Sequence, residues 1–208
     1  MKGKFITFEG IEGCGKSTQA KLLGKYFAAQ GYDILQTREP GGPKISEAIR
    51  DVLLSIDNME MLPETEMLLY MASRSQHTGE WIIPALKEGK IVISDRFYDS
   101  TIAYQGAARN IDSNIIDTIR EYATYGLVPE ITILIDLPVE IGFSRISTRE
   151  IDRLEQESIS FHKKVRDGFL ALAKKHSDRF IVINGDQSVD AIHAEIVEKI
   201  SKLMRLGR

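Results

Sequence analysis

The chain has 208 residues, 43% of them hydrophobic and 27% charged, which is typical of an ordinary globular protein with one domain. Its formal net charge of −3 gives no support to duplex nucleic acid as the main partner, because proteins that bind the phosphate backbone usually carry a basic surplus. The single cysteine, Cys14, excludes a disulfide within the chain, and no apolar run has the length of a signal peptide or a membrane span, so we expect a cytoplasmic protein.

Five short apolar runs, rich in β-branched residues, are spread along the chain. Runs of this length and composition are typical of strands that are covered on both faces in a parallel sheet. We therefore predict strands at residues 4–8, 33–37, 91–94, 131–135 and 179–183.

Longer stretches with helical spacing separate these runs. Residues 16–30 are predicted to form a helix that ends at Gly31. Residues 63–88 are predicted to form one or two helices, which begin at Pro63 and end at Gly89.

After the last strand, apolar residues recur at helical intervals from Val189 to Leu203, with Ser188 as the expected N-cap. Strands that alternate with helices indicate an α/β fold with a doubly wound parallel sheet.

In such sheets ligands bind beyond the carboxyl ends of the strands. Three polar motifs lie at such ends: residues 10–18, residues 38–42, and the pair Asp95 and Arg96.

The first of these motifs, GIEGCGKST, has the spacing of a loop that wraps phosphates. Its glycines let several backbone N–H groups face one anion, and the start of the following helix adds partial positive charge. Lys16 would reach the β- and γ-phosphates, and the Ser17 hydroxyl suits Mg²⁺. The alternative to a phosphate-binding loop is a glycine-rich turn followed by a lysine at the start of the helix. Cys14 is expected to be a small residue that is tolerated inside the loop. The expected ATP-binding residues are Gly10, Ile11, Glu12, Gly13, Cys14, Gly15, Lys16, Ser17 and Thr18.

Arginines accompany the other motifs, namely Arg38, Arg50, Arg74 and Arg96. A guanidinium group is a planar fork that matches a phosphate dianion or the polar edge of a base better than an ammonium group does. For each arginine the alternative is a surface salt bridge. Asp95 could hold magnesium through water, or it could cap a helix.

Arg145, Arg149 and Arg153 follow one another at intervals of four residues. In a helix they would share one face and repel each other, although neighbouring acidic residues could offset this in a solvated helix. We favour a mobile lid, at about residues 143–157, whose arginines neutralise the charge of a migrating phosphoryl group.

These motifs together resemble the bacterial thymidylate kinases, in the type of that family whose arginines lie in the lid. The resemblance runs nearly end to end and is carried by the phosphate loop, TREPGG (37–42), EAIR (47–50), ASRSQH (72–77), DRFYDSTIAYQG (95–106), DRLEQES (152–158) and FHKKVRDGFLALA (161–173). It implies a P-loop kinase domain that spans residues 1–208 and has a five-stranded sheet. It also implies transfer of the ATP γ-phosphoryl group to dTMP, which gives dTDP for dTTP biosynthesis, with Mg²⁺ and a homodimer.

The resemblance also assigns roles to residues. Arg38, Arg50 and Arg96 would surround the dTMP phosphate, Arg74 would bind the thymine edge, and Tyr70 would stack on the base. Thr101 and Gln105 would line the base pocket, Tyr104 would crowd the 2′ side of the sugar, and Glu12 would face the sugar and the acceptor phosphate. The implied catalytic residues are Lys16, Glu12, Arg96, Arg149 and Arg153, the implied metal ligands are Ser17 and Asp95, and Asn184 to Ser188 would cover adenine or form a plain turn.

Two other functions remain open at this point. One is a kinase for another nucleotide or for a deoxynucleoside. The other is a nucleotide-dependent switch, although the Asn-Lys-x-Asp element that a GTPase would use to read guanine does not occur in the chain.

Overall fold

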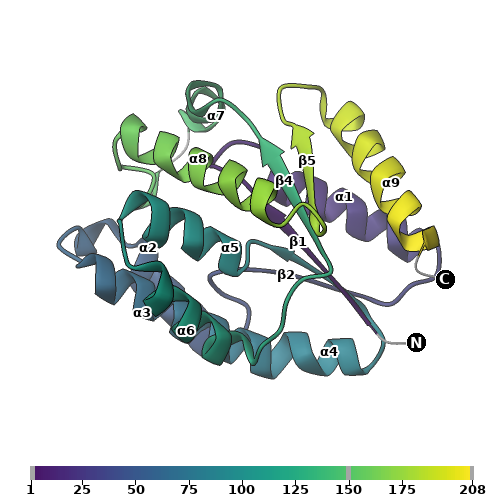
Figure 1. Ribbon diagram of the computed structural model, residues 1–208, viewed down its shortest axis with the longest axis horizontal. Helices are drawn as coiled ribbons and strands as arrows, with labels where there is room; N and C mark the ends of the chain where they lie inside the picture. Colours follow the sequence, from purple (N-terminus) through teal and green to yellow (C-terminus); the bar gives the residue numbers. More distant parts are fainter. Residues whose placement is uncertain (1–2, 149–150, 207–208) are drawn as a thin grey trace.

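The computed structural model describes residues 3–148 and 151–206 and contains one sheet of five parallel strands (Figure 1). The strands are β1 (Lys4–Glu9), β2 (Ile34–Arg38), β3 (Ile91–Asp95), β4 (Ile131–Asp136) and β5 (Phe180–Asn184), in the order β2-β3-β1-β4-β5. All five predicted strands are confirmed, and so is the α/β doubly wound fold. The three central strands are almost wholly buried, which is why their sequences are continuous apolar runs rather than alternating ones.

Helices cover both faces of this sheet (Figure 1). α1 (Lys16–Ala29) and α9 (Val189–Leu206) pack together on one face, and α8 (Ile159–Lys175) packs with the segment η3 (Ile102–Ala108) on the other. The remaining helices are α2 (Lys44–Leu54), η1 (Ile56–Asn58), α3 (Pro63–His77), η2 (Thr78–Ile82), α4 (Ile83–Lys87), α5 (Tyr98–Thr101), α6 (Ser113–Thr124) and α7 (Val139–Ile146).

The predicted helix boundaries agree with this arrangement. α1 ends just before Gly31, which has a φ of 83° that suits glycine. Residues 63–88 form α3, one wider π-type turn and α4 in continuous succession, beginning at Pro63 in the first helical turn. The Ser188 hydroxyl accepts a hydrogen bond from the backbone N–H of Ala191 (3.2 Å), which confirms the expected N-cap of α9.

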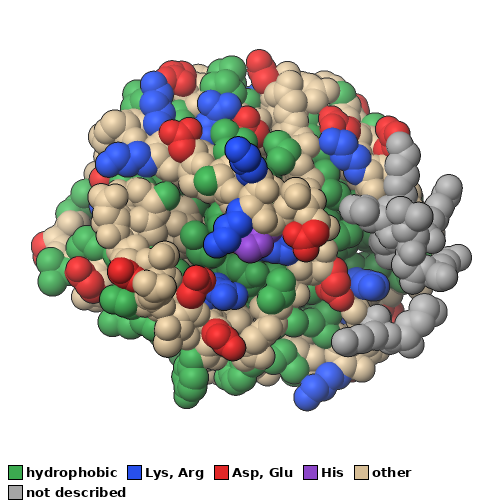
Figure 2. All heavy atoms as spheres, viewed as in Figure 1, with side chains coloured by type: hydrophobic (Ala, Val, Ile, Leu, Met, Phe, Trp, Pro, Cys, Tyr) green, Lys and Arg blue, Asp and Glu red, His purple; other side chains and the backbone are tan. Residues whose placement is uncertain are grey.

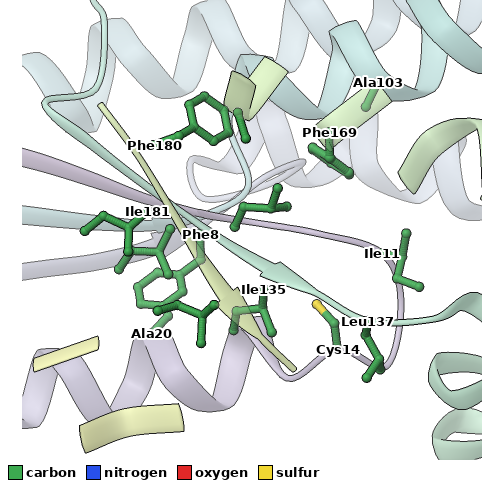
Figure 3. Packing of buried hydrophobic residues seen from close by; sticks show 14 of the residues in the cluster. Phe8, Ile11, Cys14, Ala20, Ala103, Ile135, Leu137, Phe169, Phe180 and Ile181 are labelled. Atoms are coloured by element: carbon green, nitrogen blue, oxygen red, sulfur yellow. The ribbon is translucent and has the colours of Figure 1, made fainter. Parts of the chain in front are cut away.

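The apolar core joins the sheet to α1 and to the start of the phosphate loop. Figure 3 shows Phe8 of β1, Ile135 of β4 and Ile181 of β5 close to Ala20 of α1. Cys14 lies beside this cluster and is fully buried, as expected of a small residue tolerated inside the loop. Burying each of the large side chains stabilises the fold by about 1.5–3 kcal/mol, so the loop is anchored on a rigid base.

The lid region does not form the single helix that would have placed its arginines on one face. α7 ends at Ile146, residues 151–158 form turns, and α8 begins after Ser158, whose hydroxyl accepts from the N–H of Phe161 (3.2 Å). Arg145 therefore lies on a helix and Arg153 in a turn. The alternative of a solvated helix is wrong for the described part of this region, and Arg149 lies outside the described residues.

The surface seen in Figure 2 carries basic and acidic side chains that are interspersed rather than gathered by sign. Within the part of the chain that the structure describes, no helix is both long and apolar enough to cross a bilayer. On the face that Figure 2 shows, the described residues make no basic stripe of the kind that binds a phosphate backbone.

Candidate active site

A cavity of about 440 Å³ lies at the carboxyl ends of β1, β2 and β3. These strand ends are adjacent in the sheet, so segments that are far apart in the sequence meet there. The cavity is lined by most of the predicted site residues: Glu12, Gly13, Lys16, Ser17, Arg38, Arg50, Tyr70, Asp95, Arg96, Thr101, Tyr104 and Gln105.

The phosphate loop connects β1 to α1 and is shaped by glycines. Gly10, Gly13 and Gly15 have φ angles of 139°, 72° and 99°, which side chains other than glycine rarely adopt. A Cβ on Gly13 would lie 2.1 Å from the carbonyl oxygen of Gly142, so the loop also packs tightly on α7. The Lys16 ammonium group folds back over the loop and donates to the carbonyl oxygen of Ile11 (2.7 Å), which holds a positive charge at the mouth of the loop.

The two predicted metal ligands are in contact, since the Ser17 hydroxyl donates to Oδ2 of Asp95. Hydroxyl and carboxylate oxygens are the hard ligands that Mg²⁺ prefers, and this ion usually keeps several waters and substrate phosphates in its shell. Among the described residues, no cluster of three or more His, Cys, Asp or Glu side chains could bind a metal without such help. The pair therefore fits Mg²⁺ that arrives with a nucleotide.

Arg96 links the end of β3 to the phosphate loop. Its guanidinium group donates to Oε1 of Glu12 (2.7 Å), to the carbonyl oxygen of Gly10 (3.1 Å) and to Oγ of Ser100 (3.0 Å). It also lies over the ring of Tyr104, 5.1 Å from the ring centre, and the Tyr104 hydroxyl donates to the same oxygen of Glu12 (2.6 Å). These contacts place one arginine between the loop and the rest of the cavity.

Glu12 is held ionised in this arrangement. Burial alone would raise its pKa, but Arg96 and then Lys16 outweigh burial and lower the pKa below its ordinary value. Its other oxygen, Oε2, lies 3.6 Å from Nδ1 of His162, which is fully buried. Burial lowers the pKa of His162 although Glu12 acts in the opposite direction, and sequence analysis had not singled this residue out.

Arg38 and Arg50 come together at the other side of the cavity. Arg38 forms a bidentate pair with Glu47 (2.8 and 3.1 Å), and Arg50 donates to the carbonyl oxygen of Pro40 (2.7 Å). Burial and then the charge of Arg38 lower the pKa of Arg50. An anion between these two guanidinium groups would relieve their repulsion, so the pair favours a phosphate ligand.

Arg74 lies behind the cavity wall rather than on it. It is 1% exposed and donates to Oε2 of Glu39 (2.7 Å), to Oγ1 of Thr101 (2.9 Å) and to the carbonyl oxygen of Phe97 (3.1 Å). In this position it orients Thr101, which does line the cavity. Its partner Glu39 was not anticipated, because nothing local in the sequence marks a carboxylate that pairs with a residue of another element.

The lid arginines occupy different surroundings. Arg153 is 3% exposed, lies 2.7 Å from Oε2 of the buried Glu66 and donates to the carbonyl oxygen of Leu53 (2.9 Å), and it is not among the residues that line the cavity. Arg145 donates to the carbonyl oxygens of Gly185 (3.2 Å) and Gly13 (3.4 Å). It therefore bridges the phosphate loop to the segment that was expected to cover adenine or to form a plain turn.

Ser100, Asp152, Leu154 and Glu155 also line the cavity but were not predicted as site residues. Ser100 had a detectable signal, because it places a hydroxyl only four residues after Arg96 in the motif that follows the strand. The other three belong to the turns between α7 and α8, whose path depends on contacts with distant parts of the chain.

Comparisons with known proteins agree with this geometry. The model of the thymidylate kinase family matches residues 8–196. A thymidylate kinase from Thermoanaerobacter sp. (strain X514) is 50% identical over 204 residues, which are 98% of this chain and 100% of that protein. Another, from Caldanaerobacter subterraneus subsp. tengcongensis, is 47% identical over 205 residues, 99% of this chain and 98% of that one. The crystal structure of thymidylate kinase from Ehrlichia chaffeensis has a TM-score of 0.79 at 35% identity, covering 97% and 99% of the two chains.

Proposed function

Because the chain belongs to the thymidylate kinase family, it is a kinase that transfers the γ-phosphoryl group of ATP to dTMP and forms dTDP and ADP, and we propose that the two substrates meet in the cavity of about 440 Å³. The observation that carries this proposal is that one cavity contains both the phosphate loop and three arginines from other segments, Arg38, Arg50 and Arg96.

On the acceptor side, the 5′-phosphate of dTMP binds to these three guanidinium groups. Tyr70 stacks on thymine, while Thr101 and Gln105 line the pocket of the base. Arg74, which is buried behind the cavity wall, serves the thymine edge by orienting Thr101. Support comes from Gln105, whose amide donates to Glu66 (2.9 Å), and from Thr101, which is fixed by Arg74, so both side chains are held in one orientation. The ring of Tyr104 lies against the 2′ side of the sugar, and Glu12 faces the sugar and the acceptor phosphate.

On the donor side, the backbone of residues 10–18 wraps the ATP phosphates and Lys16 reaches the β- and γ-phosphates. The Ser17 hydroxyl and Asp95 would hold Mg²⁺, and the ion would supply neutralisation of phosphate charge there. The segment from Asn184 to Ser188 lies over adenine. Arg145 supports this placement, because it ties that segment to the loop.

No side chain has to act as a strong general base, because the acceptor phosphate is already a nucleophile. Catalysis then consists mostly of positioning and of charge neutralisation. Lys16, Glu12 and Arg96 provide the fixed part of this environment. Arg149 and Arg153 of the lid provide the part that closes, and Arg153 has to leave its buried pair with Glu66 to do so.

The same family membership leads us to propose one kinase domain over residues 1–208, with a lid at about 143–157, that works in the cytoplasm as a homodimer. Large apolar side chains are exposed on three neighbouring helices: Val52 on α2, Leu68 on α3, and Ile115 and Tyr122 on α6. Figure 1 shows these helices side by side. A surface of this kind is typical of an interface between subunits.

A panel of acceptors tests the proposed activity. ADP release from ATP is measured with dTMP, dUMP, dCMP, dGMP and thymidine at equal concentrations. We expect dTMP to give the highest kcat/KM and thymidine to give none above background, since it carries no phosphate for the three arginines. Preference for another monophosphate, or ADP release that does not depend on the acceptor, would contradict the proposal.

A further inference from the structure

Glu9 is a fully buried carboxyl group at the end of β1, immediately before the phosphate loop. It does not line the cavity, and neither the binding of ATP nor that of dTMP as proposed above makes use of it. Its Oε1 accepts from the backbone N–H of Phe97 (2.8 Å), and its Oε2 accepts from the hydroxyl of Ser100 (2.6 Å). Both partners lie in the short segment that follows Arg96.

That segment has a strained backbone. Arg96 has a φ of 73°, in the left-handed region that residues other than glycine rarely adopt and that persists only where the surroundings impose it. The N–H of Arg96 donates to the carbonyl oxygen of Phe8 (2.9 Å), the residue before Glu9. The next N–H along the chain, that of Phe97, goes to Glu9 itself. The end of β1 thus holds the backbone of Arg96 through two consecutive N–H groups.

The side chain of Arg96 is held through the same carboxyl group. Oγ of Ser100 accepts from the guanidinium group (3.0 Å) while its hydroxyl donates to Glu9. An apolar side chain in place of Glu9 would fill the same buried space without the penalty of burying a polar group. The carboxyl group is instead bonded on both oxygens to groups that set the conformation of Arg96.

From this geometry we infer that Glu9 is a positioning residue for the acceptor phosphate, which orients Arg96 through Phe97 and Ser100 without contacting either substrate. The inference rests on the proposed role of Arg96 in binding the phosphate of dTMP.

The charge of Glu9 decides which substitution preserves this role. The charged and titratable groups that face it are Asp99, Arg96, Arg179 and Tyr98. Burial, reinforced by Asp99, raises the pKa of Glu9 from 4.5 to about 8, so the group is mostly neutral at pH 7. Glutamine is then the closest neutral mimic, because its oxygen still accepts from Phe97. Its amide donates to Oγ of Ser100, which reverses the direction of that bond and matches an acid whose proton lies on Oε2. Methionine has a similar length but keeps neither hydrogen bond.

The test compares Glu9→Met with Glu9→Gln at pH 7, measuring KM for dTMP, KM for ATP and the midpoint of thermal unfolding. Glu9→Met is expected to raise KM for dTMP about tenfold, the loss typical of leaving a buried hydrogen-bonding group without its partner, and to raise KM for ATP by less than about twofold. Glu9→Gln is expected to restore KM for dTMP to within about threefold of the wild-type value.

The matched control is Glu130→Gln. Glu130 accepts from the backbone N–H of Phe5 (2.6 Å) at the opposite end of the same strand, so it makes a similar bond far from the cavity. This variant should leave both KM values unchanged. If Glu9→Met does not fold, Ser100→Ala breaks the same link to the guanidinium group and should show the same selective rise.

Equal changes in both KM values, a fall in thermal stability with no change in either KM, or a Glu9→Gln variant as impaired as Glu9→Met would each overturn the inference. Arg96→Ala separates this inference from the proposed function. If Arg96→Ala leaves KM for dTMP unchanged, the proposed phosphate site is wrong. If it raises KM while the Glu9 and Ser100 variants do not, only the role of Glu9 is wrong.

Discussion

Burial raises the pKa of Glu9 from 4.5 to about 8, so the folded protein keeps a proton there that the unfolded chain releases above about pH 5. Stability that depends on this proton is fully present below pH 4.5 and is lost as the pH rises through 8. Relative to a Glu9→Gln variant, the free energy of unfolding of the wild type should therefore fall between pH 5 and pH 8, by up to about 1.4 kcal/mol per pH unit.

Urea unfolding at pH 5.5, 6.5 and 7.5 measures this difference between the two proteins. A difference that stays constant over the three pH values would mean that the folded protein does not hold the proton. Glu130→Gln again serves as the control, because Glu130 is exposed and bonds the opposite end of β1.

Arg96 and Glu12 show what single residues contribute beyond their charge. Each is held by several partners, and Glu12 remains ionised although it is largely shielded from solvent, because Arg96 and Lys16 flank it. Arg96 was singled out by its position after a strand, whereas the role of Glu12 was implied by the resemblance to the family. The left-handed backbone of Arg96 was not, because it depends on partners in β1 that only the folded sheet brings near.

At the scale of elements, α7 acts as a support for the phosphate loop. A Cβ on Gly142 of α7 would lie 2.4 Å from the carbonyl oxygen of Glu12, so Gly142→Ala has to push the loop away from the helix. We expect this substitution to raise KM for ATP severalfold and to lower stability by about 1–3 kcal/mol, as overpacking does.

KM for both substrates and urea unfolding test this expectation. Ser144→Ala on the same helix is the control, since Ser144 is exposed and its hydroxyl donates to the carbonyl oxygen of Ile141 within α7 (2.8 Å). A Gly142→Ala variant with an unchanged KM for ATP would show that the loop does not depend on this contact.

The lid arginines should separate into two kinds. Arg153→Ala removes one partner of the buried Glu66, which keeps Arg109 (3.1 Å), so we expect a loss of about 3 kcal/mol of stability. Arg149→Ala is expected to lower kcat at least about tenfold, because a closing arginine stabilises the transferred phosphoryl group, with little effect on stability.

Thermal unfolding and steady-state kinetics of the two single variants distinguish these outcomes. Lys163→Ala is the control for stability, because its pair with Glu140 is exposed and contributes little. If Arg149→Ala retained its kcat, the transition-state role assigned to the lid arginines would be wrong for that residue.

The elements that sequence predicted well are those whose signal is local. The strand ends near Glu9, Arg38 and Asp95 followed from apolar runs, and the start of α9 from the hydroxyl of Ser188. The burial of Arg153 could not be predicted from the local sequence, because its partners Glu66 and Leu53 lie on other elements far along the chain. Most site residues that line the cavity were predicted, whereas Glu9 and Glu39, which hold Arg96 and Arg74 in place, were missed.

At the scale of the whole molecule, the strand order explains why the two substrates would meet. The phosphate loop follows the central strand β1, and the arginines of the acceptor side follow β3 and β2, the next two strands in the sheet. Parallel strands place all these ends at one edge. A donor bound by the loop and an acceptor bound by the arginines then face each other over a short distance.

The proposed homodimer makes a further prediction at this scale. Leu68 is 52% exposed on α3, the helix that packs against both α2 and α6. Leu68→Glu would bury a charge in the interface and should give a monomer in sedimentation velocity, while the wild type sediments as a dimer. Val189→Glu is the control, as Val189 is 50% exposed at the start of α9 on the other face of the sheet. A wild-type monomer would contradict the proposal.

The most direct test of the whole account is a crystal structure with ADP, Mg²⁺ and dTMP bound together. We predict that the β-phosphate of ADP lies within the loop of residues 10–17 and that the phosphate of dTMP lies within hydrogen-bond distance of the Arg96 guanidinium group, between the loop and Arg38. A dTMP molecule bound outside this cavity, or one whose phosphate points away from all three arginines, would contradict it.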